Sequence, residues 1–217
     1  MLNLAEELFL LALNDEKGTL HGATSYLPYG LAGAILAELA LAGKVGLDHD
    51  RKLIILDDTS SGDELLDDAM AYIAASKKPR KLTVWVNTLG DKKYRKRVAA
   101  RLVQKGILQR QEKKYIWVIP YVAYPQQDAS AKYWIKQHMR AMILAAEKPE
   151  PRGVILLSLA QACQMSGLVF TRDERKMASR GIKALVKGEI FGEAVAQVIE
   201  EIESAAATAV IAATAYS

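Results

Sequence analysis

The side chains in this chain that are best suited to chemistry are cationic, and they gather in one segment. Fourteen Lys and Arg residues fall between Lys77 and Lys114, against two acids in the same stretch, Asp91 and Glu112. The 217 residues carry 29 basic side chains and a formal net charge of only +4, so this segment is a local asymmetry. Concentrated positive charge attracts polyanions, and the two common classes are nucleic acid and an anionic membrane surface.

The densest cations lie at the predicted start of a helix. The sequence runs Lys-Lys-Tyr-Arg-Lys-Arg from Lys92 to Arg97, and the helix is predicted to begin near Asp91. Lys92, Arg95 and Lys96 share one helical face, and a helix N-terminus adds unpaired N–H groups and the positive end of its dipole. Like charges at helical spacing, without compensating acids, destabilise an isolated helix. The pattern therefore favours an anion-binding site, for example for a phosphate group.

Motifs of catalytic, metal and cofactor sites are absent from the sequence. It has no P-loop, GxGxxG, HExxH or paired-cysteine signature, and its three histidines stand in separate segments. The paired acids at 57–58 and 67–68 are predicted to be surface carboxylates. Cys163 is alone, which excludes an internal disulfide and indicates a small core residue in a reducing compartment. We therefore expect a non-enzymatic protein that needs no metal and no cofactor.

The apolar content predicts a globular protein without a membrane span. Apolar residues make up 51% of the chain. Glu6 and Glu7 interrupt the apolar N-terminus, so no secretory signal is predicted. Glu200, Glu201 and Glu203 interrupt the apolar C-terminal stretch, and the uncharged remainder is too short to cross a bilayer of roughly 30 Å. We expect a cytoplasmic protein, either free or peripheral on the cytoplasmic face of a membrane.

The elements that position the cations are predicted to be mainly helical. Apolar residues at helical spacing predict helices at about 3–14, 29–42, 63–75, 97–105, 129–147, 153–168, 172–187 and 190–213. Gly62 and Ser61 are the predicted N-cap of the helix at 63–75. The segment Leu82–Leu89 is compatible with a strand or a short helix, and its Thr, Val and Trp content favours a strand.

A helix followed by Gly and then by a β-hairpin is predicted twice. Gly43 ends one helix before a hairpin with strands at 44–47 and 53–56. Gly106 ends another before 107–108, a polar turn at 109–114, and a strand at 115–119. This order is typical of a winged helix, and its recurrence indicates an internal repeat. The expected fold is therefore mainly α, a single compact helical domain with small β-hairpins and two winged-helix-like repeats.

Two functions are compatible with this pattern. A winged-helix protein would lay a helix into a DNA groove, with Arg110, Lys113 and Lys114 of the hairpin on phosphates. A lipid-binding protein would instead hold an anionic headgroup at the cationic start of its helix. Both need clustered cations, so composition does not separate them.

Five segments resemble the Golgi phosphoprotein 3 family and occur in the family's order. They lie at 4–18, 30–45, 63–69, 95–108 and 155–162, and the second contains Gly-Leu-Ala-Gly-Ala-Ile-Leu-Ala-Glu-Leu. The resemblance extends over essentially the whole chain and implies one domain, residues 1–217. It implies a mostly helical, non-enzymatic protein that binds phosphatidylinositol 4-phosphate and associates peripherally with membranes. Eukaryotic members also act as adaptors for Golgi glycosyltransferases. With this resemblance, nucleic acid becomes the less favoured partner of the two.

The resemblance also implies where the headgroup binds. Two Arg residues of the family's pocket correspond to Lys92 and Arg95, whereas its Trp and a third Arg correspond to Ala23 and Ala32. Each lost guanidinium fork removes contacts of roughly 1.5–3 kcal/mol. General attraction to an anionic phospholipid headgroup is expected to persist. The implied headgroup-binding residues are Lys92, Arg95, Lys93 and Arg97, with His21 close in sequence to the missing Trp.

The remaining aromatic residues are predicted to be structural. Trp85, Trp117 and Trp134 are expected to pack in the core. The 121–128 segment before Trp134 resembles a family hairpin implicated in oligomerisation and membrane contact, which implies a homo-oligomer and an unknown protein client as further partners. The resemblance implies that the family's domain starts at residue 2, without the long basic extension of eukaryotic members, and we expect a bacterial-type member.

Overall fold

The computed structural model describes residues 1–115, 118–145, 148–186 and 193–215. Its helices are α1 (Leu4–Ala12), α2 (Leu27–Leu41), α3 (Glu64–Ala74), α4 (Leu82–Leu89), α5 (Lys92–Gln104), α6 (Ser130–Leu144), α7 (Pro151–Ala162), α8 (Arg175–Val186) and α9 (Glu193–Ala215), with short 3-10 turns η1 (Gly22–Thr24) and η2 (Ser166–Leu168). Strands β1 (Val45–Leu47), β2 (Lys52–Ile55) and β3 (Arg80–Lys81) form one antiparallel sheet in that order, and β4 (Gln111–Tyr115) pairs with β5 (Ile119–Ala123) in another. The prediction of a mainly helical single domain with small hairpins is confirmed.

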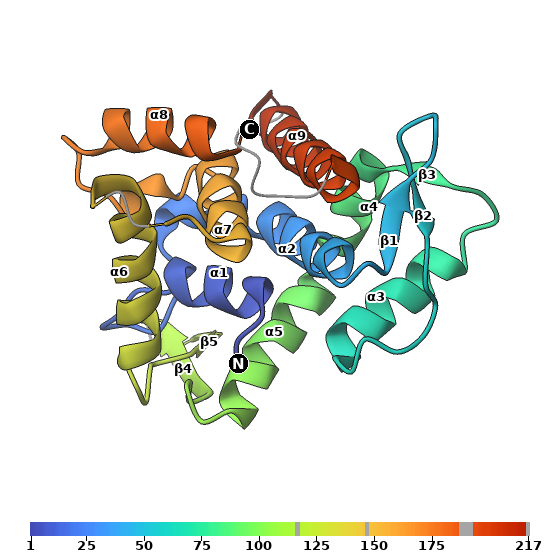
Figure 1. Ribbon diagram of the computed structural model, residues 1–217. Coiled ribbons are helices and arrows are strands. Elements are labelled where there is room, and N and C mark those ends of the chain that lie inside the picture. Colours follow the sequence, from blue (N-terminus) through green and yellow to red (C-terminus); the bar gives the residue numbers. More distant parts are fainter. Residues whose placement is uncertain (116–117, 146–147, 187–192, 216–217) are drawn as a thin grey trace.

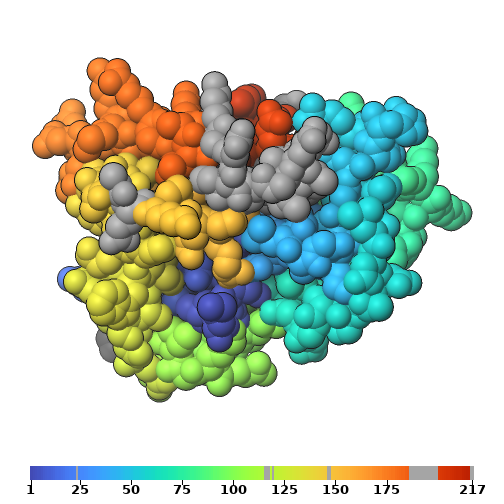
Figure 2. Space-filling view, viewed as in Figure 1, coloured from blue at the N-terminus to red at the C-terminus, as the bar shows by residue number. Residues whose placement is uncertain are grey.

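Helix α2 lies at the centre and is covered by α1, α4, α7 and α9 (Figure 1). Apart from Glu38, the side chains along its buried length are apolar on all sides, as expected of a helix that is buried all round. Gly33 allows α7 and α9 to approach closely, because a Cβ there would lie 2.8 Å from Leu159 Cδ2 and 3.2 Å from Ile202 Cγ2. In the face shown in Figure 2, the N-terminal residues (dark blue) surface only in a small area between α5 and α7.

The helix–Gly–hairpin order occurs in both predicted places. Gly43 and Gly106 follow α2 and α5 with φ of 69° and 71°, the left-handed conformation that glycine tolerates. The first hairpin, β1–β2, has the predicted strands. The second is shifted, because residues predicted to form its turn are in β4 (Gln111–Tyr115) and the chain returns as β5 (Ile119–Ala123). Polarity misled the prediction, since Glu112–Lys114 is a strand exposed to solvent.

The prediction of a strand at Leu82–Leu89 is wrong, because this segment is helix α4. Its β-branched content is outweighed by helical spacing, which places four apolar side chains on one face against α2 and α9. The buried residues are Leu82, Trp85, Val86 and Leu89.

The N-cap of α3 also differs from the prediction. Asp63, rather than Gly62 or Ser61, caps the helix, and its Oδ1 accepts hydrogen bonds from the amides of Leu65 (2.9 Å) and Leu66 (3.3 Å). Asp63 is therefore fixed at the helix start, where its carboxylate also suits the helix dipole.

The tryptophans divide into different environments. Trp85 is 3% exposed, so its predicted place in the core is confirmed. Trp134 is 66% exposed, so its predicted core packing is wrong. Helix α6 buries Met139 and Met142 on another face, which turns Trp134 outward. Trp117 lies outside the described residues.

Cys163 and the paired acids have the predicted environments. The Cys163 thiol is fully buried, and burial raises its pKa to about 12, so it is not a nucleophile at neutral pH. Asp57 is an exposed carboxylate that pairs with Lys44 at 2.7 Å. Asp67 accepts hydrogen bonds from the hydroxyls of Ser60 and Ser61.

A partly buried carboxyl between α7 and α9 predicts how stability depends on pH. Burial raises the pKa of Glu203 to about 7, and the Ser158 hydroxyl donates to this carboxyl. The unfolded chain releases the proton near pH 4.5, so the contribution of Glu203 to stability is fully present below that pH and is lost as pH rises from about 4.5 to about 7. Glu203→Gln keeps an acceptor and should reduce this fall, measured as urea midpoints across the range.

The carboxyl of Glu7 adds to the same trend, because burial raises its pKa to about 7 as well. The fall in stability with pH should therefore be reduced in Glu203→Gln and not abolished. The control is Glu16→Gln, an exposed side chain in the loop after α1, which should leave the pH profile unchanged. Equal profiles for the wild type and both variants would contradict the assignment to Glu203.

Candidate anion-binding site

Helix α5 begins inside the cationic segment, as predicted. Its N-cap is Asp91, and its first turn contains no acid and starts with Lys92. Tyr94, Val98 and Leu102 are buried and pack the helix into the core. Because these apolar residues fix the rotation of α5, its cations are divided between two faces.

One face of α5 is neutralised by acids of α1 and α3. The side chain of Arg101 lies 2.6 Å from Asp63 Oδ2 and 3.1 Å from Glu6 Oε1. Glu6 is completely buried, so this pair ties α5 to α1 in the interior. The pairs on this face are Arg97 with Asp68, Arg101 with Asp63 and Glu6, and Lys105 with Glu6.

The other cations at the start of α5 are not neutralised in this way. Lys92, Lys93 and Lys96 are exposed and Arg95 is half-buried. None of these four side chains forms an ion pair with a carboxylate in the described ranges. Their charges add to the unpaired N–H groups at the start of α5, which produces a site suited to an anion.

Two adjoining cavities make this face of α5 concave, and we call them together the α5–hairpin groove. The first has a volume of about 410 Å³ and the second about 500 Å³. Lys96, Val122 and Tyr124 line both. The first cavity is also lined by Arg95 and Ala99 of α5, by Phe9, Leu13, Gly18, Thr19 and Leu20, and by Pro120 and Tyr121. The second adds Ala100, Val103, Gln104 and Arg110.

The walls of the groove are held together by contacts between distant segments. The amide of Tyr124 donates to the Gly18 carbonyl at 2.6 Å, which joins the hairpin's exit to the loop after α1. The Tyr124 ring meets Phe9 of α1 edge to face, with centroids 6.2 Å apart. The amide of Gln109 donates to the Pro125 carbonyl at 2.9 Å. The hairpin is thereby fixed beside α5.

The structure brings together only some of the predicted site residues. Arg95 lines the groove, whereas Lys92 and Lys93 precede it on α5 and Arg97 lies on the neutralised face. Lys96 belongs to the predicted cationic face and is central to the groove. The groove is also lined by Arg110, which the winged-helix alternative placed on phosphates, and by Tyr121 and Val122 of the segment that resembles a family hairpin.

The two alanines at family positions have different surroundings. Ala32 is fully buried in α2, so the core occupies the place where the resemblance implies a guanidinium. The side chain of Ala23 lies outside what the structure describes. His21 lies near Lys132; burial first, and then this cation, lower the pKa of its imidazole, so it adds no charge at neutral pH.

The chemistry of the groove is that of binding. The Arg95 guanidinium can hold two phosphate oxygens at once, and Lys96 adds a mobile point charge. Tyr121 and Val122 are each 37% exposed at its rim and offer apolar surface. Within the part of the chain that the structure describes, no three His, Cys, Asp or Glu side chains gather to hold a metal. Nor is any helix in this part long and apolar enough to span a membrane.

Comparison with known proteins agrees with the resemblance seen in the sequence. The family model described as Golgi phosphoprotein 3 (GPP34) matches residues 4–202. The chain belongs to the Golgi phosphoprotein 3 family. That match includes α1, α5 and both hairpins, and so contains every residue of the α5–hairpin groove.

Two fungal relatives agree with this family membership. Vacuolar protein sorting-associated protein 74 of Eremothecium gossypii is 29% identical over 165 residues, 66% of this chain and 49% of the relative. The protein of the same name from Schizosaccharomyces pombe is 31% identical over 164 residues, 65% of this chain and 48% of the relative. The chain thus spans about half the length of the curated relatives it matches.

Proposed function

We propose that this protein binds the phosphorylated headgroup of an anionic phospholipid in the α5–hairpin groove and thereby associates peripherally with a membrane. The observation that carries the proposal is the division of α5 into two faces. Arg97 and Arg101 are paired with carboxylates, whereas Arg95 and Lys96 line a cavity and have no acid partner in the described ranges. Unpaired cations in a concave site are suited to a phosphate group.

The family resemblance makes phosphatidylinositol 4-phosphate the favoured lipid. Its phosphomonoester carries more charge than a phosphodiester and matches a guanidinium fork together with a helix N-terminus. Lys92 and Arg95 occupy two of the family's headgroup positions, and the alanines at the other two weaken the site. We therefore expect weaker, more charge-dependent binding than four hydrogen-bonding positions would give. The proposed role is that of a non-enzymatic adaptor in the cytoplasm.

Liposome sedimentation tests this function. The protein should sediment with phosphatidylcholine liposomes that contain phosphatidylinositol 4-phosphate, and less with liposomes given equal charge by phosphatidylserine. Lys92→Ala combined with Arg95→Ala should lower partitioning about 30-fold or more, since each cation at the surface contributes about 1 kcal/mol.

The matched control is Lys77→Ala combined with Lys78→Ala, which removes the same charge from another exposed segment and should have a small effect. If both double variants lost liposome binding equally, the interaction would be general charge attraction, which would contradict a specific site in the α5–hairpin groove. Tight, sequence-selective binding of duplex DNA without liposome association would favour the winged-helix alternative instead.

A further inference from the structure

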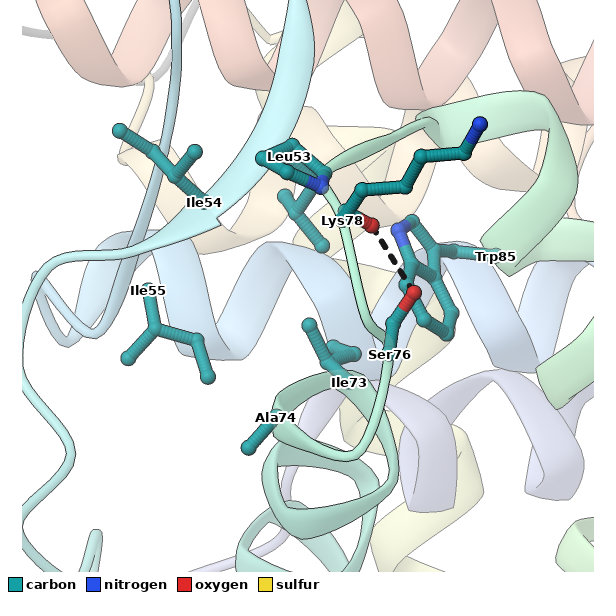
Figure 3. A pocket seen from close by; sticks show the side chains of 9 residues that line it. Leu53, Ile54, Ile55, Ile73, Ala74, Ser76, Lys78 and Trp85 are labelled. Carbon is teal, nitrogen blue, oxygen red and sulfur yellow. Dashed lines mark hydrogen bonds between the residues drawn. The ribbon is translucent and has the colours of Figure 1, made fainter.

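A second apolar groove lies between strand β2 and helix α3 and is separate from the α5–hairpin groove. Its main cavity has a volume of about 280 Å³ (Figure 3). The lining residues include Leu53, Ile54 and Ile55 of the strand, Ile73 and Ala74 of the helix, and Trp85 of α4. Ile55 and Ala74 also line a neighbouring cavity of about 280 Å³, so the groove continues along α3, where Asp58 and Asp67 make it acidic.

Trp85 brings a buried donor without an acceptor to this cavity. Its indole N–H finds no hydrogen-bond partner among the described residues, although the side chain is only 3% exposed. Figure 3 shows the indole nitrogen on the edge of the ring that faces Lys78. The Lys78 carbonyl accepts instead from the Ser76 hydroxyl at 2.9 Å. Buried polar groups are nearly always paired, so this N–H is suited to an acceptor from a ligand.

Strand β2 has an open edge over the same cavity. The amides of Leu56 and Asp48 donate to the carbonyls of Lys44 (2.8 Å) and Lys52 (2.9 Å), which are hydrogen-bonded pairs of the β1–β2 ladder. Because such pairs alternate in an antiparallel ladder, the N–H and C=O of Ile55 point away from β1. Neither group has a partner among the residues that the structure describes.

Strand β3 covers only the first half of β2. Strand β3 pairs with β2 only at Lys52↔Lys81 and Leu53↔Arg80. Continued in this register, Pro79 would face Ile54 and Lys78 would face Ile55, but no strand pair beyond Leu53↔Arg80 forms. The chain before β3 runs outward from the sheet to α3 (Figure 1). The β2 edge at Ile55 is thus left free beside an apolar cavity.

The segment around Lys78, which lines one end of the cavity, is strongly cationic. Four exposed basic residues stand within five positions, and none pairs with a carboxylate in the described part of the chain. They are Lys77, Lys78, Arg80 and Lys81. An acidic residue of a ligand would be attracted here, next to the apolar cavity.

We propose that this groove binds an extended acidic peptide segment of a partner protein by adding a short strand to β2. One peptide residue exchanges backbone hydrogen bonds with Ile55, and an aliphatic side chain fills the cavity. A peptide carbonyl accepts from the Trp85 indole after a small outward movement of the exposed residues 77–79. Acidic side chains of the peptide lie against Lys78 and its basic neighbours.

Selection from a library of random short peptides displayed on phage tests the proposal. Peptides enriched on the wild-type protein should combine aliphatic with acidic residues. They should bind Ile55→Pro about tenfold or more weakly, because proline removes the N–H that faces the open edge. They should also slow hydrogen exchange of the Ile55 amide and shift the Trp85 indole proton resonance of the wild-type protein.

The controls keep the outcome decisive even if Ile55→Pro is unstable. Trp85→Phe retains most of the ring but loses the N–H and should also weaken the peptides, whereas Lys92→Ala with Arg95→Ala should leave them unaffected. The proposal would be overturned if the selected peptides bound Ile55→Pro and Trp85→Phe as well as the wild type. It would also be overturned if the peptides left hydrogen exchange of the Ile55 amide unchanged. Octanoate that fills the cavity and binds all variants equally would overturn it as well, because this would assign the groove to an acyl chain.

Discussion

Replacing Arg101 by Met should destabilise the protein by about 3 kcal/mol, because it leaves a buried carboxylate with fewer partners. Arg101 joins Glu6 of α1 to Asp63 at the start of α3. Glu6 is completely buried and would keep only Lys105, at 2.7 Å, and the Asn3 amide, at 2.8 Å. Urea unfolding should show a lower midpoint with an unchanged slope.

The control for this prediction is Arg97→Met on the same helix face. Its partner Asp68 is half exposed, with a side-chain exposure of 50%, so the loss should be under about 1 kcal/mol. Equal losses for Arg97→Met and Arg101→Met would mean that burial of the carboxylate does not decide the energy. The anion-binding face contains neither residue, so both variants should still sediment with liposomes when folded.

Replacing Gly18 by Ala should both destabilise the protein and damage the α5–hairpin groove. The φ of Gly18 is 63°, and a Cβ there would lie 2.3 Å from the Pro125 nitrogen and 2.5 Å from the Tyr124 carbonyl carbon. Backbone atoms cannot yield by changing rotamer, so the loop must move and the 2.6 Å hydrogen bond from Tyr124 must break. We expect a loss of about 3 kcal/mol in the free energy of unfolding.

The matched control is Gly43→Ala. Gly43 has a similar φ of 69°, but a Cβ at this position would have nothing within 4 Å, so only backbone strain of about 1–2 kcal/mol is expected. Gly18→Ala should also weaken liposome binding although every α5 cation is retained, whereas Gly43→Ala should not. Normal sedimentation of a folded Gly18→Ala variant would show that the hairpin wall is not needed for binding.

The helices were predictable from sequence where burial and spacing agree. α2 was expected because its apolar run ends in a glycine that turns the chain, and α5 because its apolar residues recur at helical spacing. α4 was missed because the residue types of Thr83, Val84 and Val86 favour strands. The helical spacing of Leu82, Trp85 and Leu89 was visible in the sequence. Tertiary packing of these side chains outweighed the strand preference of the residue types.

The candidate site was predictable only in part. The charges at Lys92 and Arg95 could be located from composition and resemblance. Which cations stay unpaired could not, because the acids that neutralise Arg97 and Arg101 come from distant segments. The second hairpin was misplaced because a β-hairpin exposed to solvent shows no apolar alternation in its sequence. Because the hairpin was misplaced, the prediction also missed the wall of the groove at Val122.

The most direct test of a headgroup site at the start of α5 is a crystal structure with dioctanoyl phosphatidylinositol 4-phosphate, which is soluble in water. Our account predicts a phosphate within hydrogen-bonding distance of the Arg95 guanidinium, with the Lys96 ammonium beside it and the acyl chains leaving toward Val122. A lipid whose phosphate lies away from Arg95, or an empty α5–hairpin groove at saturating lipid, would contradict it.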